Sequence, residues 1–144
     1  MVGFLKDQFL MTNDALGANA EFYDVTALSN GDVLVGYFNQ GNGPMSMYAY
    51  DIKTNTTELK SSISLSGFAP LDDPNVVAFG NGGYGAVLNR AVGNLTTDKR
   101  LVFQKYKADG SADGALVELN DGFIDRIHAD ETSNGFVAIY EQRT

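Results

Sequence analysis

The chain has 144 residues, no cysteine, and a formal net charge of −8 from 18 acidic and 10 basic side chains. This length suits one domain, and the lack of cysteine excludes disulfides, thiolate metal sites and cysteine nucleophiles. The negative charge disfavours nucleic acid and anionic membranes as partners, because both select basic faces. No apolar run reaches the ~18 residues that a membrane-spanning helix needs, so we expect no membrane insertion.

A short turn sequence occurs three times. Its copies lie 51 and then 53 residues apart, at Ser29-Asn30-Gly31, Gly80-Asn81-Gly82 and Ser133-Asn134-Gly135. Each copy lies between two short apolar runs, which is the pattern of a β-hairpin with a type I′ turn. Three hairpins at one period predict three copies of one supersecondary unit.

In chain order, the sequence predicts three repeats of four short strands and no helix, because Gly, Asn or Asp interrupts every window of helical periodicity. The first repeat covers about 14–65, with strands at 25–28, 33–37, 46–50 and 59–65. The second covers 66–119, with strands at 76–79, 84–88, 101–106 and 115–119. The third covers 120–144, with strands at 126–129 and 136–140, and we expect residues 1–13 to complete it with strands at 2–5 and 9–13.

Strand alternation predicts which side chains of the second strands are buried, because residues i, i+2 and i+4 share a face. The predicted buried set is Val33, Val35, Tyr37, Ala86, Leu88, Val137, Ile139 and Tyr140. Ile139 and Tyr140 are adjacent, so a regular strand cannot bury both.

The second repeat resembles a known family. Residues 77–84, 101–106 and 108–114 are similar to a repeat of about 50 residues that occurs in tandem in large secreted bacterial proteins of the RTX adhesin and hemolysin-type group. The segment 104–110 matches the pattern x-Q-R-F-D-x-x-G, whereas the first repeat has Asp32 in place of the second glycine. The resemblance implies β-propeller-like blades and a secreted or cell-surface setting, and it transfers no catalytic residues.

Three blades are fewer than the four to eight of an ordinary propeller. Two chains could join as three plus three blades in a homodimer. Alternatively, three repeats and twelve strands also match a β-trefoil, which would be a monomer. The sequence therefore predicts an all-β fold and leaves these two ways of closing it open.

His128 is the only histidine, and it lies between Ile127 and Ala129. A catalytic triad needs an activated hydroxyl beside the histidine, and a zinc site needs more nitrogen or sulfur ligands. We interpret His128 as a strand residue equivalent to Val77 or Ala78.

Two acidic segments have a structural and a functional interpretation. Residues 109–114 (Asp-Gly-Ser-Ala-Asp-Gly) resemble part of a calcium loop, but Lys107 occupies a ligand place, so we expect a tight turn, no cofactor, and calcium only as an alternative. Four further acids gather near the third repeat: Asp121, Asp125, Asp130 and Glu131. We interpret them as a solvated loop, with paired-carboxylate glycoside hydrolysis as the alternative.

The predicted ligand site lies in the loops after the second strands, where amide and guanidinium groups meet aromatic rings that suit sugars. Its predicted residues are Tyr37, Asn39, Gln40, Asn42, Tyr48, Asn89 and Arg90. The sequence thus favours a non-enzymatic, lectin-like or adhesin-like binding module for carbohydrate or a cell-surface ligand. The alternatives are a structural subunit of a surface or viral appendage, and a glycoside hydrolase.

Overall fold

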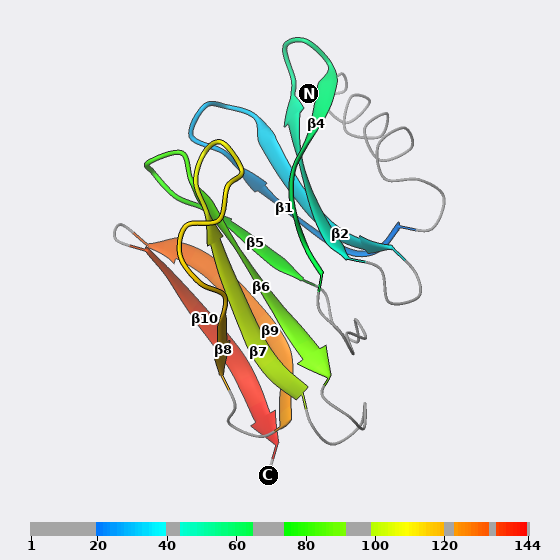
Figure 1. Cartoon of the computed structure of the whole chain (residues 1–144), viewed down its shortest axis with the longest axis vertical. Helices are drawn as coiled ribbons and strands as arrows, with labels where there is room; N and C mark the ends of the chain where they lie inside the picture. The colour runs from blue at the N-terminus through cyan, green and yellow to red at the C-terminus, as the bar shows by residue number, and fades with distance from the viewer. Residues whose placement is uncertain are drawn as a thin grey trace.

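The fold is all-β, as the sequence predicts. The computed structural model describes residues 20–39, 44–64, 74–91, 99–119, 123–132 and 135–143, and these ranges contain strands and turns but no helix. The strands form three antiparallel sheets that lie one beside the next (Figure 1). Within the described ranges these sheets close neither a barrel nor a full propeller circle.

Each sheet follows the chain as a meander. Unit 1 contains β1 (Ala20–Ala27), β2 (Val33–Asn39), β3 (Met45–Asp51) and β4 (Thr56–Ile63), paired in that order. Unit 2 contains β5 (Asn75–Ala78), β6 (Tyr84–Ala91), β7 (Lys99–Tyr106) and β8 (Val117–Leu119), also in chain order. Unit 3 is the hairpin of β9 (Phe123–Thr132) and β10 (Gly135–Arg143). Residues 1–13, expected to complete unit 3, lie outside the described ranges.

The Asn-Gly hairpins of units 1 and 2 form, but the prediction of a type I′ turn is wrong. In unit 1 the Gly31 N–H donates to the Leu28 carbonyl at 3.0 Å, and the Leu28 N–H donates to the Asp32 carbonyl at 2.8 Å. The backbone φ is +91° at Gly31 and is not positive at Asn30. This is a type I turn followed by a glycine bulge, and unit 2 repeats it at residues 79–83.

The third hairpin is one residue shorter than the other two. Its paired residues Ala129 and Ala138 are nine positions apart, whereas Val76 and Ala86 in unit 2 are ten apart. A change of one residue moves the opposite set of side chains to the core face. The prediction that Val137 and Ile139 are buried is therefore wrong.

The buried face of β10 carries Phe136, Ala138 and Tyr140, which pack on unit 2. Val137 and Ile139 are 49% and 68% exposed. The predicted burial is confirmed at most of the other positions. Val35, Tyr37, Ala86 and Leu88 are buried, and Val33 is partly buried.

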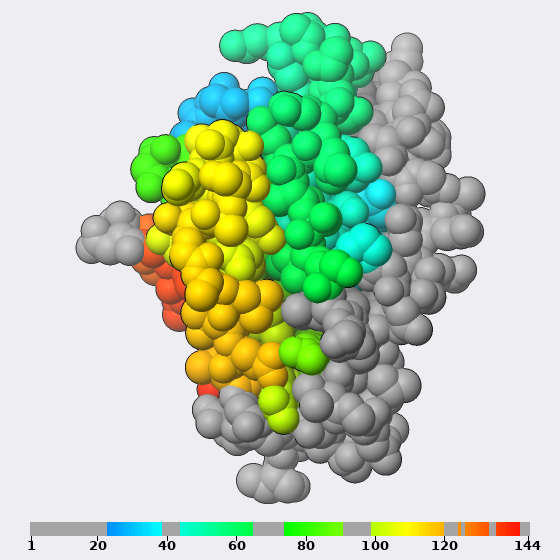
Figure 2. Space-filling model, in the orientation of Figure 1, coloured from blue at the N-terminus to red at the C-terminus, as the bar shows by residue number. Residues whose placement is uncertain are grey.

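Unit 1 stacks on unit 2 through a shared apolar core. Its members come from both sheets: Leu34, Phe38, Met45, Met47, Ile63, Val76, Tyr84, Ala86, Leu88, Val102 and Tyr106. Gly36 permits the close approach, because a β-carbon there would lie 2.5 Å from a Val76 methyl and 2.7 Å from the Met45 methyl. At the rim, the turn at 107–111 (yellow in Figure 2) lies against β4, where Gly110 meets the Lys60 carbonyl.

Unit 3 stacks on the opposite face of unit 2. Its side chains share a second core with that face, formed by Val77, Val87, Leu101, Ile124 and Ala129, with Phe79, Phe103, Ile127, Phe136, Ala138 and Tyr140 packed against it. The Phe103 and Phe136 rings stack with centroids 4.1 Å apart. Unit 2 is therefore covered on both faces, and it holds the other two units together.

We predict that Leu88→Ala lowers the free energy of unfolding by about 2–5 kcal/mol, because Leu88 is 1% exposed in the core between units 1 and 2. Denaturant unfolding followed by circular dichroism measures this change. The control is Leu59→Ala at a position that is 53% exposed, where a change within about 0.5 kcal/mol is expected. Equal losses for both variants would contradict this assignment of the core.

Candidate binding site

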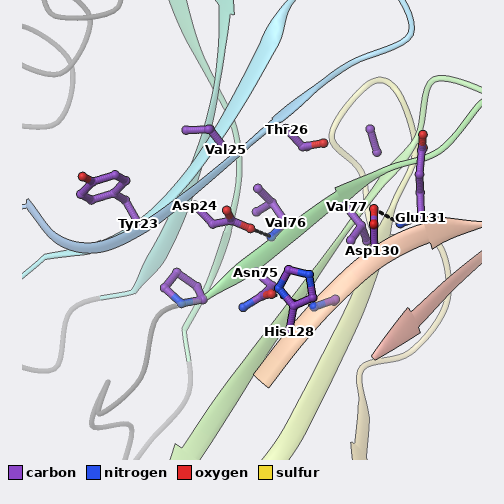
Figure 3. A pocket seen from close by; sticks show the side chains of 13 residues that line it. Tyr23, Asp24, Val25, Thr26, Asn75, Val76, Val77, His128, Asp130 and Glu131 are labelled. Carbon is purple, nitrogen blue, oxygen red and sulfur yellow. Dashed lines mark hydrogen bonds between the residues drawn. The ribbon is translucent and has the colours of Figure 1, made fainter. Parts of the chain in front are cut away.

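The first strands of the three units, β1, β5 and β9, together line a pocket of about 430 Å³ (Figure 3). Its polar lining residues include Asp24 and Thr26 from β1, Asn75 from β5, and His128, Asp130 and Glu131 from β9. The ring of Tyr23, also from β1, borders the pocket and is 64% exposed.

We call β1, β5 and β9 the inner strands. A side chain of β1 binds the backbone of β5, and a side chain of β5 binds the backbone of β9. The carboxylate Oδ2 of Asp24 accepts a hydrogen bond from the backbone N–H of Val76 at 2.9 Å. The amide Oδ1 of Asn75 accepts one from the backbone N–H of Ala129 at 2.7 Å. The Asn75 Nδ2 also donates to the Ile127 carbonyl at 3.3 Å. These bonds satisfy edge N–H groups that strand pairing leaves over.

The same two contacts set the equivalence of the three units. Asp24 accepts from Val76, which follows Asn75, and Asn75 accepts from Ala129, which follows His128. Asp24, Asn75 and His128 therefore occupy equivalent positions in units 1, 2 and 3. His128 lies in β9, but its predicted equivalence to Val77 or Ala78 is wrong, because Ala129 takes the place of Val76 in these contacts and His128 therefore takes the place of Asn75.

The pocket is electronegative. Asp24, Asp130 and Glu131 contribute three carboxylates, and the described lining residues include no lysine or arginine. The Asp130 carboxylate also accepts the backbone N–H of Glu131 at 2.8 Å. Among the described residues, no group of three or more His, Cys, Asp or Glu side chains is arranged to hold a metal ion. The carboxylates and the Tyr23 ring offer hydrogen-bond acceptors beside an aromatic face.

Of the loop residues predicted for the ligand site in unit 1, Tyr37 and Tyr48 lie together in the described structure, with Tyr37 buried. Tyr37 is only 4% exposed, and its ring stacks on Tyr48 with centroids 5.9 Å apart. Gln40 and Asn42 lie outside the described residues, as does the side chain of Asn39. The two tyrosines therefore form part of an apolar cluster on unit 1.

The two predicted site residues of unit 2 lie within the protein. Asn89 is 4% exposed. The Arg90 guanidinium binds the Glu118 carboxylate at 2.8 Å, and Arg100 binds the second oxygen of the same carboxylate at 2.8 Å. The hydrogen bond from Arg100 and the positive charges of both arginines hold the pKa of Glu118 below its usual range. Arg90 and Arg100 thus fasten β8 to the sheet of unit 2.

The segment interpreted as a turn or a calcium loop forms a turn. The Lys107 N–H donates to the Ser111 carbonyl, and the Gly110 N–H donates to the Lys107 carbonyl, both at 2.9 Å. The Asp109 carboxylate accepts from the backbone N–H and the hydroxyl of Ser111, at 2.9 and 2.6 Å. These hydrogen bonds lower the pKa of Asp109. Its acidic side chain therefore stabilises the turn.

The inner-strand residues escaped the sequence reasoning because hydrophobic patterning draws attention to apolar positions. A signal was nevertheless present. Asp24, Asn75 and His128 each lie six residues before the asparagine of a repeated turn, and all three are polar residues within apolar strands. Polar residues repeated at the period of a unit indicate a contact that recurs between units.

No family model, curated protein or solved structure matches this chain. Among the described residues there is no helix that is long and apolar enough to span a membrane.

We predict that Asn75→Ala lowers the free energy of unfolding by about 1–3 kcal/mol, because it leaves the buried N–H of Ala129 without its acceptor. Chemical denaturation measures the loss. The control is Asn30→Ala in the turn of unit 1, where the lost bond to the Asp32 N–H is exposed and can be replaced by water. A larger loss in the control would show that the contact between inner strands contributes little.

We predict an acid-dependent contribution from Glu118. Because its folded-state pKa lies below the ordinary value of 4.5, its stabilising effect is fully present above that pH and disappears as the pH falls through the folded-state pKa. Glu118→Gln should lower stability at pH 7 by about 1–2 kcal/mol, with a difference from wild type that shrinks towards pH 3. Thermal unfolding at several pH values measures this, with Glu58→Gln at an exposed pair as the control. A difference independent of pH would refute the assignment.

Proposed function

We propose that this chain is a non-enzymatic binding module whose units are β-propeller-like blades, and that the pocket between their inner strands binds carbohydrate. The observation that carries the proposal is the convergence of β1, β5 and β9 on one polar pocket bordered by an exposed tyrosine (Figure 3). A secreted or cell-surface location follows from the same proposal.

The blade arrangement is supported by how the sheets are ordered and stacked. Each sheet begins at an inner strand and continues outward in chain order. Neighbouring sheets pack face to face through apolar cores, and their inner strands meet at the pocket. Radial repetition of such sheets around an axis is the plan of a propeller. The trefoil alternative would need its strands to close a barrel.

The pocket's composition narrows the ligand class. An aromatic ring such as Tyr23 packs on the apolar face of a sugar, while carboxylates accept hydrogen bonds from its hydroxyl groups. Three carboxylates in one pocket repel anions. We therefore propose a neutral or amino sugar, and we expect sialylated or sulfated glycans to be excluded.

Two of the three carboxylates of the pocket already accept hydrogen bonds from the backbone. Asp24 and Asp130 each already accept a backbone N–H, which holds them in place as acceptors. A glycoside hydrolase needs one carboxylic acid free to deliver a proton to the leaving oxygen, so the hydrolase alternative would require Glu131 in that role.

A second candidate function is that of a structural subunit. The observation that favours it is the set of exposed apolar side chains on units 1 and 3, among them Val25 at 53%, Val137 at 49% and Ile139 at 68% exposure. Exposed apolar residues of this kind are typical of surfaces that meet another protein.

We predict that a glycan array detects neutral or amino sugars and that Tyr23→Ala weakens binding of the best glycan about tenfold or more by calorimetry. Tyr23→Phe keeps the ring and should retain most of the affinity. Leu59→Ala, on an exposed site away from the pocket, should leave it unchanged.

Several results would contradict the proposal. Binding that is unaffected by Tyr23→Ala would place the ligand elsewhere, and selective binding of acidic glycans would contradict the charge argument. Mass spectrometry of the incubated glycan tests the hydrolase alternative, because a cleaved product would show that the module is an enzyme.

A further inference from the structure

We infer that a second copy of this chain binds head to tail, joining the β9–β10 end of one copy to the β1 edge of the other. The inference rests on the blade arrangement proposed above, but not on the identity of the pocket's ligand. It starts from a contact between units that the chain already makes twice and whose two halves remain exposed at its ends.

The repeated contact joins an acceptor side chain to a backbone N–H of the next inner strand. Asp24 accepts from Val76 at 2.9 Å, and Asn75 accepts from Ala129 at 2.7 Å. The third acceptor position in this series is His128. Its side chain is exposed, and no hydrogen bond of the imidazole is found within the described ranges. A neutral imidazole has one nitrogen that can accept a hydrogen bond.

The missing donor is the backbone N–H of Val25, the residue equivalent to Val76 and Ala129. The Leu28 N–H is bonded to Asp32 across the β1–β2 hairpin. Because N–H directions alternate along an antiparallel strand, the Val25 N–H points away from β2, to the open edge of β1. The Val76 N–H points away from β6 in the same way and meets Asp24 there.

Apolar side chains at equivalent positions also pack together at each contact between units. Val76 packs at Gly36 between units 1 and 2, and Ala129 shares a core with Val87 between units 2 and 3. Gly36 and Val87 are both equivalent to Ile139 in register.

The third apolar pair is therefore Ile139 of one copy with Val25 of a second copy. In the single chain these two side chains are 68% and 53% exposed. A second copy would supply both partners that these groups lack within the described residues, the N–H donor and the valine. Val35 and Tyr37 on the neighbouring face of unit 1 are already buried, so we expect the second copy to meet unit 1 along the β1 edge. Such head-to-tail contacts close a ring of two copies when the rotation allows.

Sedimentation equilibrium of the full chain at micromolar concentration tests the association. We expect twice the chain mass of 15.5 kDa. Ile139→Lys and His128→Leu should each weaken association about tenfold or more, whereas His128→Asn, which installs the acceptor used by unit 2, should retain it. Leu59→Lys, at another exposed apolar site, is the control and should leave the mass unchanged. A single-chain mass at every concentration would overturn the inference.

Disulfide trapping tests the head-to-tail geometry independently. The chain has no cysteine, so Val25→Cys and Ile139→Cys each introduce a single thiol, at exposed positions where substitutions leave the fold intact. On mild oxidation, a mixture of the two variants should give the mixed disulfide dimer in large excess over either self-paired dimer. Predominant self-pairing of one variant would show a face-to-face dimer and would overturn the inference. Carbohydrate binding is measured separately, so either proposal can fail alone.

Discussion

The arrangement of this protein depends on a hydrogen bond from a side chain of one inner strand to the backbone of the next. Inner strands have an edge with no neighbouring strand, and an unsatisfied N–H on that edge costs about as much as a lost hydrogen bond. Asp24 and Asn75 supply the acceptors. Because the bond fixes the position of one strand against the next, it also determines which side chains face each other where the sheets stack.

Unit 2 lies between the other two units in the resulting stack. One face of its sheet packs on unit 1 and the other on unit 3. Space for this arrangement comes from the small residue Gly36, which admits Val76, and from Ala129, which fits beside Val87. At each contact between neighbouring units a small residue therefore packs opposite a larger one. The hydrogen bond between the inner strands keeps these two residues opposite each other.

The pocket is a consequence of the same geometry. Strands that begin each unit must converge, so polar residues on them collect in one place even though they are about 50 residues apart in the chain. Three of the residues predicted for a ligand site near the second strands have other roles. Tyr37 and Tyr48 stack in an apolar cluster, and Arg90 fastens Glu118. A binding function proposed for this protein therefore belongs to the inner strands.

The sequence by itself determined the all-β class, the positions of the hairpins and most of the buried second-strand residues, because turn chemistry and strand alternation are local properties. It could not place Ile139, since a hairpin shorter by one residue reverses the buried face. Nor could it show that His128 belongs with Asn75. The equivalence of His128 and Asn75 was decided by the tertiary structure, because it depends on hydrogen bonds between residues 52 and 54 positions apart, which no local pattern specifies.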